Sequence, residues 1–158
     1  MQFSKSLLIK AAMVVFLVLY LGWIYNSDNS QDVSMEDISF TMENISSVTE
    51  MQKRGKGDLQ RYFSVMDTDT EGYFFYKDIS PMSVNEVLIM KAASRDKAVS
   101  LLEAAEAHLE SQENVFGAYG TDQMGLLSEA SVESKGNYVW YMCGPDASTW
   151  RRAFTSLI

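Results

Sequence analysis

The chain has 158 residues, a net charge of −8, one cysteine, one histidine and 47% apolar residues. This length gives room for one domain. A single cysteine excludes an intramolecular disulfide, and one cysteine with one histidine cannot supply the four nitrogen and sulfur ligands of a structural zinc site. The acidic balance argues against a nucleic-acid-binding surface, which needs clustered Lys and Arg. We therefore expect no nucleic-acid partner, and no pattern in the sequence indicates a cofactor.

An apolar run at residues 7–25, LLIKAAMVVFLVLYLGWIY, contains one charged residue, Lys10. A helix of this length, with its 1.5 Å rise per residue, is about 28 Å long, which is close to the hydrocarbon thickness of a bilayer. Lys10 lies near one end, where its side chain can reach the headgroups. Tyr20, Trp23 and Tyr25 gather toward the other end, as in an interfacial aromatic belt. The run predicts a transmembrane helix.

The basic residues around this run predict its orientation. Lys5 and Lys10 lie at its N-terminal side, and no basic residue follows it until Lys53. The positive-inside rule then gives a cytoplasmic N-terminus and an extracytoplasmic C-terminal part. A cleaved secretory signal is the alternative, but no small-residue cleavage site follows the apolar core. We expect residues 1–27 to form an uncleaved anchor in the cell membrane.

The residues after the anchor differ from it in composition. Residues 28–33 contain few apolar side chains and predict a short tether. Residues 34–158 are expected to form the extracytoplasmic domain. Beyond residue 27 the chain has 11 basic and 21 acidic residues, a charge of −10, so the exported part is strongly acidic.

The first half of this domain begins with an amphipathic pattern. Ser34, with Asp37 three residues later, is a candidate N-cap, and glycines at 55 and 57 are placed to end the helix. A shorter helical turn is expected at 58–63. The apolar positions of the first helix recur at intervals of three and four residues: Met35, Ile38, Met42, Ile45, Val48 and Met51.

Two hairpins and two further helices complete the prediction. Aromatic and β-branched runs at 73–79 and 84–92 predict the first hairpin, and 130–133 with 138–143 predict the second. A long amphipathic helix is expected at 96–116 between the hairpins. Asp146 can cap a terminal helix that places the side chains of residues 150, 154 and 157 on one face. The order predicts an α+β domain of two layers, with an antiparallel sheet covered by helices on one face.

The segment 67–78, DTDTEGYFFYKD, matches the spacing of an EF-hand loop, in which oxygens converge on one hard cation and a glycine permits the sharp turn. Calcium binding is therefore an alternative function. Against it, the fifth position is Glu, the twelfth is Asp, and aromatic strand residues begin within the loop. We favour a polar turn that leads into a strand. The candidate ligands would be Asp67, Asp69, Glu71, Tyr73 and Asp78.

A second alternative is an envelope hydrolase or transferase. Ser94 and Lys97 have the S-x-x-K spacing of acyl-serine enzymes, but the accompanying SDN and KTG elements are absent from the sequence. We expect Ser94 to begin the long helix and Lys97 to be solvated. His108 is the only imidazole base, and at the border of an apolar helix face it is expected to pack. Cys143, at the end of a strand, is expected to be a small buried apolar residue.

Several segments carry a resemblance to a known family: DLQRYF, EGYFFYKDISPMSVNEVLIMKA, HLESQENVFGAYG and SKGNYVWYMCGPD. In this order they resemble the DUF4358 domain family of small exported bacterial proteins, over most of residues 35–157. The resemblance implies that 82–91 is a strand after a hairpin turn. It also implies attachment to the membrane by a lipoprotein signal or an N-terminal helix, near envelope machinery such as membrane O-acyltransferases. This chain has the helix and no lipid-accepting cysteine near it.

These observations together predict the function only in outline. We expect a single-pass membrane protein whose extracytoplasmic domain acts as a non-catalytic binding or accessory module of the cell envelope. Its partners would be the membrane, through residues 7–25, and an envelope protein.

Overall fold

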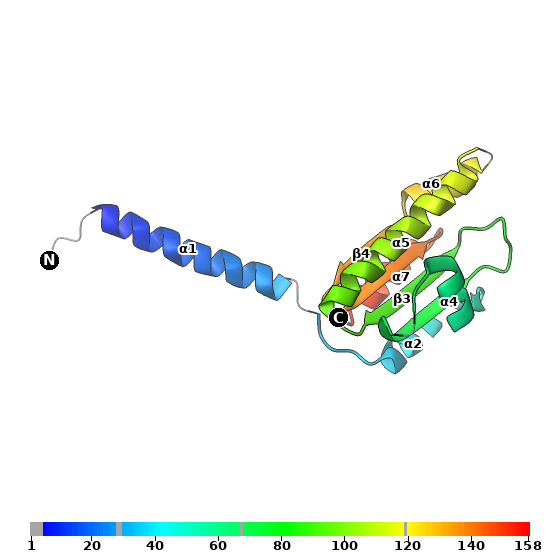
Figure 1. The fold of residues 1–158 in the computed structure, drawn as a ribbon, viewed down its shortest axis with the longest axis horizontal. Helices are drawn as coiled ribbons and strands as arrows, with labels where there is room; N and C mark the ends of the chain where they lie inside the picture. Colours follow the sequence, from blue (N-terminus) through cyan, green and yellow to red (C-terminus); the bar gives the residue numbers. More distant parts are fainter. Residues whose placement is uncertain (1–4, 28–29, 67, 119) are drawn as a thin grey trace.

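The structure is a computed structural model that describes residues 5–27, 30–66, 68–118 and 120–158, without the side chains of 5–8 and 23–27. An N-terminal helix extends away from an α+β domain (Figure 1). The elements in chain order are α1 Lys5–Ser27, α2 Met35–Glu43, α3 Ser46–Thr49, β1 Gln52–Lys53, α4 Lys56–Phe63, β2 Thr70–Lys77, β3 Glu86–Ala92, α5 Arg95–Phe116, α6 Thr121–Ser128, β4 Ser131–Lys135, β5 Tyr138–Cys143 and α7 Ala147–Thr155.

The described strands form one antiparallel sheet in the order β1-β2-β3-β5-β4. Both predicted hairpins are confirmed, β2 with β3 and β4 with β5. Gly136 has a positive φ of 59° at the first central position of the two-residue turn between β4 and β5. A type II′ turn requires this conformation, and glycine adopts it without steric cost.

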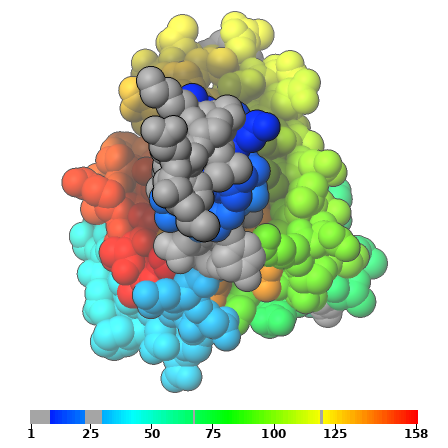
Figure 2. All heavy atoms as spheres, turned by 90° about the vertical axis from the view of Figure 1, so that its left-hand side faces the viewer, coloured from blue at the N-terminus to red at the C-terminus, as the bar shows by residue number. Residues whose placement is uncertain are grey.

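Helices cover both faces of the sheet, so the predicted two-layer arrangement with one covered face is wrong. Helices α4, α5 and α6 pack on one face, and α2, α3 and α7 pack on the other. In a space-filling view turned by 90°, the cyan and red parts of the chain lie on one side of the domain and the green parts on the other (Figure 2). The domain therefore has three layers and two separate apolar cores.

The physical reason lies in the central strands, which are apolar on both faces. All six residues of β5 are buried, as are six of the seven in β3. Strands that are buried on both faces have continuous apolar runs, whereas a sheet with one exposed face has alternating ones. The runs VLIM in β3 and VWYMC in β5 carry this signal in the sequence.

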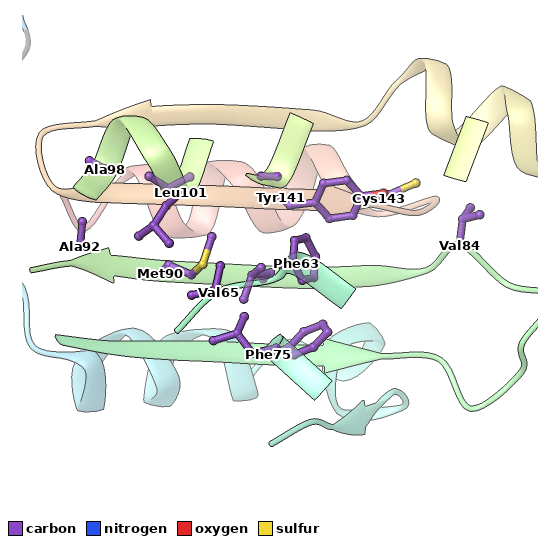
Figure 3. Packing of buried hydrophobic residues seen from close by; sticks show 14 of the residues in the cluster. Phe63, Val65, Phe75, Val84, Met90, Ala92, Ala98, Leu101, Tyr141 and Cys143 are labelled. Carbon is purple, nitrogen blue, oxygen red and sulfur yellow. The ribbon is translucent and has the colours of Figure 1, made fainter. Parts of the chain in front are cut away.

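The core beneath α5 is built from side chains of β2, β3, β5, α4 and α5 (Figure 3). Phe63 and Phe75 pack edge to face with ring centroids 5.7 Å apart, and Phe63 makes the same contact with Tyr141. Such aromatic pairs prefer particular ring orientations, and they stabilise the core beyond the burial of apolar area alone.

The helix predicted over 35–51 is divided into two. Ser34 caps α2 as predicted, since its Oγ accepts a hydrogen bond from the Asp37 N–H. The helix ends at Asn44, whose side chain donates to the Phe40 carbonyl, and Ile45 is extended at φ −93° and ψ 114°. An Asn side chain that bonds to nearby backbone competes with continuation of a helix. The chain then continues through α3 and the short strand β1 rather than to the glycines.

The last helices differ from the prediction in two details. The residues after α5 include a further helix, α6, which was not predicted because glycines at 117, 120 and 125 indicate loop. Asp146 precedes α7 but makes no side-chain capping bond. Trp150 and Phe154 are buried as predicted.

In the described part of α1, the large apolar side chains from Ile9 to Leu21 are exposed. Among the described residues, no helix combines the length and apolar character that a membrane crossing requires. The side chains of Trp23 and Tyr25, assigned to an aromatic belt, lie outside the described part of the chain.

Candidate functional site

One candidate residue for calcium binding, Asp69, contacts one candidate residue for acyl-serine catalysis, Lys97, at the start of α5. Ser94 Oγ accepts from the Lys97 N–H at 3.3 Å, so Ser94 is the helix N-cap as predicted. The Lys97 side chain is 45% exposed, as expected for a solvated lysine, and its Nζ also lies 2.7 Å from Asp69 Oδ1. The Lys97 hydrogen bond is the main cause that lowers the pKa of the Asp69 carboxyl. The Lys97 amine therefore contacts Asp69, and the contact between Lys97 and Ser94 is the backbone N–H bond of the helix cap.

The candidate calcium ligands do not converge in the structure. Asp69 and Asp78 flank the two ends of β2, whose extended backbone separates them by about 30 Å at 3.3 Å per residue. Between them, Glu71 pairs with Lys91 at 3.5 Å and Tyr73 pairs with Met90 in the sheet. Asp67 lies outside the described residues. Within the described chain, no three His, Cys, Asp or Glu residues are grouped to hold a metal ion.

A buried group of charges lies between the sheet and α5. Glu86 is 0% exposed, and its Oε2 accepts from Lys77 Nζ at 2.8 Å and from His108 Nε2 at 3.1 Å. Lys77 and Glu86 are register partners at the end of the β2–β3 hairpin. His108 is thus buried as expected, but it serves in an ion-paired cluster rather than in apolar packing.

Both imidazole nitrogens of His108 face acceptors. Nε2 faces the Glu86 carboxylate, and Nδ1 lies 3.2 Å from the Tyr62 carbonyl oxygen. A carboxylate and a carbonyl only accept hydrogen bonds, so both contacts are satisfied together when each nitrogen carries a proton. His108 thus links the Glu86 carboxylate of β3 to the Tyr62 carbonyl of α4, and Lys77 Nζ contacts the same carboxylate oxygen.

The ionisation of the surrounding groups follows from burial and from these partners. Burial raises the pKa of Glu86, but the hydrogen bonds and charges of His108 and Lys77 outweigh it, so the net pKa lies below its ordinary value of 4.5. Burial raises the pKa of the Cys143 thiol to about 12 and also raises the pKa of Tyr141. Neither Tyr141 nor Cys143 is ionised at neutral pH.

Two polar atoms of this cluster are buried without a hydrogen-bond partner, Glu86 Oε1 and the Tyr141 hydroxyl. Unsatisfied buried polar atoms are costly and call for an explanation. A substrate has no direct route to the group, since Glu86, His108 and Lys77 are 0%, 4% and 8% exposed. The cluster therefore joins β2, β3 and α5 inside the domain.

A polar hollow of about 290 Å³ opens at the end of the sheet where β2 ends and β3 begins. Trp150 contributes to its lining and is held by a 3.0 Å hydrogen bond from Nε1 to Ser47 Oγ. A side chain at Gly144, which has a φ of 150°, would collide with the Trp150 ring. The lining contains three carboxylates and no basic residue: Ser47, Glu50, Met51, Asp78, Asn85, Pro145, Asp146 and Trp150.

Sequence reasoning missed Lys77, Glu86 and Tyr141 as partners of His108. One signal was available, because Lys77 and Glu86 have opposite charges at the two facing ends of a predicted hairpin. His108 reaches Lys77 and Glu86 because α5 packs on the sheet. No local pattern in the sequence indicates this packing.

A family model described as "Domain of unknown function (DUF4358)" matches residues 44–144. No curated protein and no solved structure matches the chain. The matched segment includes β1 to β5 and therefore the whole buried charge cluster.

Proposed function

The chain belongs to the DUF4358 family, and from this premise we propose that it is a membrane-anchored, extracytoplasmic and non-catalytic binding module of the cell envelope. One observation carries the proposal, the exposure of apolar side chains along α1. They range from 49% for Tyr20 to 71% for Phe16. Exposed apolar area of this extent is unfavourable in water, and transfer to lipid or to a protein partner removes the penalty.

The sequence supports a lipid environment for this helix. The apolar run 7–25 continues on both sides of the residues whose side chains are described, and its one charge, Lys10, lies near the N-terminal end. Lys5 precedes the run, Lys10 lies near its N-terminal end, and no basic residue follows it until Lys53, which supports a cytoplasmic N-terminus. The domain then lies on the outer side of the cell membrane.

The domain itself supports binding rather than catalysis. His108 and Cys143 are buried, and Ser94 and Lys97 are engaged in a helix cap and an ion pair. The accessible features are instead the polar hollow and the loop between β2 and β3. We assign the partner to the proteins of the envelope.

Flotation of the full-length protein with phosphatidylcholine and phosphatidylglycerol vesicles tests the anchor. We expect wild type and Leu17→Ala to float, and Leu17→Arg to lose most of the floating fraction, because a central arginine costs about 2.5–3.5 kcal/mol on insertion. Wild-type protein that stays in the dense fraction would contradict the proposal.

A complementation assay in cells distinguishes binding from catalysis. We expect Lys97→Met to retain the wild-type phenotype, since Lys97 only pairs with Asp69 in our proposal. Loss of the phenotype with an unchanged thermal unfolding curve would favour the hydrolase or transferase alternative.

A further inference from the structure

The end of the predicted tether is bonded to the domain. The Tyr138 hydroxyl accepts from the Val33 N–H at 2.8 Å and donates to the Val33 carbonyl at 2.7 Å. Lys91 Nζ lies 2.6 Å from Asp32 and 3.5 Å from Glu71. We call these five residues the tether clasp. Hydrogen bonds and ion pairs both hold the tether clasp together.

The domain side of the tether clasp is rigid. Lys91 and Tyr138 are register partners on the central strands β3 and β5. Tyr138 is 1% exposed and packs edge to face on Phe154, with centroids 5.9 Å apart. The Asp32 hydrogen bond is the main cause that raises the pKa of Lys91, and the reciprocal bond lowers the pKa of Asp32. Both groups are therefore charged at neutral pH.

The turn between β4 and β5 also adjoins this segment. Any side chain at Gly136 would collide with Ser30, so the glycine that forms the type II′ turn also admits the tether. Ser30 and Asp32 together with Glu71, Lys91, Asn137 and Tyr138 line a shallow hollow of about 220 Å³. The tether thus has a fitted path across this end of the sheet.

We propose that the tether clasp fixes the orientation of the domain on the membrane, with the start of α5 toward the lipid headgroups and the β2–β3 loop away from them. This inference rests on the proposed membrane anchor. Helix α1 ends at Ser27, and three Cα steps of 3.8 Å limit its distance from Ser30 to about 11 Å. The clasped end of the domain therefore lies next to the end of the anchor (Figure 1).

An unclasped tether would not have this effect. Six flexible residues have a root-mean-square span of roughly 13 Å and leave the attached domain free to rotate. The tether clasp holds Asp32 and Val33 against the domain, so a shorter span of chain joins the anchor to the point where the domain is held.

The opposite end of the domain is then the surface presented to a partner. Strand β2 extends over eight residues, so the β2–β3 loop is displaced from the clasped end by about 26 Å. The loop is ordered by hydrogen bonds from the Ser80 N–H to Asp78 Oδ1 and from the Ser83 N–H to the Ser80 carbonyl. It exposes Ile79 at 73% and Met82 at 57%.

Energy transfer to labelled headgroups tests this orientation. The full-length protein would carry a donor at Asp96→Cys, in the first turn of α5, or at Met82→Cys, in vesicles with an acceptor-labelled lipid. Cys143 is buried and need not be removed. We expect clearly more transfer from position 96 than from position 82.

The double variant Lys91→Ala, Tyr138→Phe removes the side-chain contacts of the tether clasp. We expect it to reduce the difference in energy transfer between positions 96 and 82 at least twofold. Lys53→Ala, which removes an exposed ion pair to Glu43, is the matched control and should leave the difference unchanged. Circular dichroism verifies that the variants fold. Equal transfer from both positions in floating wild-type protein, or no effect of opening the clasp, would overturn the inference while the anchor stands. Failure to float would instead overturn the anchor and, with it, the orientation.

Discussion

The two faces of the sheet differ in how their buried polar groups are paired. On the α2, α3 and α7 face, the buried indoles have partners: Trp150 donates to Ser47 and Trp140 donates to Ser131, each at 3.0 Å. On the α4, α5 and α6 face, the buried Glu86 carboxylate binds Lys77 and His108, and two buried polar atoms have no hydrogen-bond partner. One face is a conventional apolar core, and the other contains a charged group within it.

The two faces are therefore expected to contribute differently to the stability of the fold and to the register of its elements. Replacement of a buried ion cluster by apolar residues is often neutral or stabilising, whereas removal of one member is costly. We therefore expect the charged cluster to fix how β2, β3 and α5 meet rather than to add stability, while the apolar residues of both cores stabilise the fold. Four substitutions or conditions, in order of decreasing effect, test this contrast.

Trp150→Ala should have the largest effect, because it empties a site on the apolar face where the side chain is 1% exposed. We expect a loss of about 4 kcal/mol in the free energy of unfolding. Urea unfolding followed by fluorescence measures it. Ser47→Ala, which removes only the hydrogen-bond partner of the indole, should cost about 1 kcal/mol. Equal losses for the two variants would show that the ring packing contributes little.

Glu86→Gln should cost about 3 kcal/mol, since it leaves Lys77 and His108 buried without their carboxylate. The combined variant Lys77→Met, Glu86→Leu and His108→Leu removes every charge and should recover most of this loss. Chemical unfolding of both variants measures the difference. A combined variant less stable than Glu86→Gln would mean that the cluster stabilises the fold.

Acid should destabilise the protein, with a smaller effect in Glu86→Gln. The folded pKa of Glu86 lies below 4.5, so its carboxylate contributes stability above pH 4.5 that is lost as the pH falls through the folded pKa. The pKa values of other carboxylates are lowered as well, so wild type should lose stability steadily below pH 4.5. Thermal unfolding between pH 3 and pH 6 should show a shallower decline for the variant. Parallel curves would indicate that Glu86 is not ionised in the fold.

Ser94→Ala should have the smallest effect, about 1 kcal/mol, because it removes only the N-cap of α5. Ser94→Asp retains a capping acceptor and should restore most of the stability. Thermal unfolding of the two variants makes the comparison. A loss of cellular activity in Ser94→Asp at wild-type stability would favour a nucleophilic role for the serine.

Local patterns predicted the elements that depend on neighbours in the chain. The Ser34 and Ser94 caps, both hairpins and the helix over 96–116 are set by short-range hydrogen bonds and by periodic apolar residues. The break at Asn44 was missed because one apolar periodicity runs through both α2 and α3, and only the Asn44 side-chain bond divides them.

The candidate site was less predictable from local patterns. Lys97 and Asp69 belonged to two different functional hypotheses, yet they pair with each other at 2.7 Å. The spacing of residues 67–78 also fits a calcium loop, but the favoured prediction of a turn that leads into a strand is confirmed, since β2 begins at Thr70 and its extended chain separates Asp69 from Asp78. Strand pairing, which involves residues far apart in sequence, overrode the short motif.

The sequence by itself determined the α+β class and the antiparallel hairpins, because short-range periodicity and turn residues are sufficient for them. It also determined the family, through the resemblance of several segments to DUF4358. Only the tertiary structure decided that both faces of the sheet are covered, that Glu86 unites Lys77 and His108, and that the tether is clasped by Lys91 and Tyr138. Each of these contacts joins residues from separate elements. Their formation depends on how helices and strands pack, and no local pattern specifies that packing.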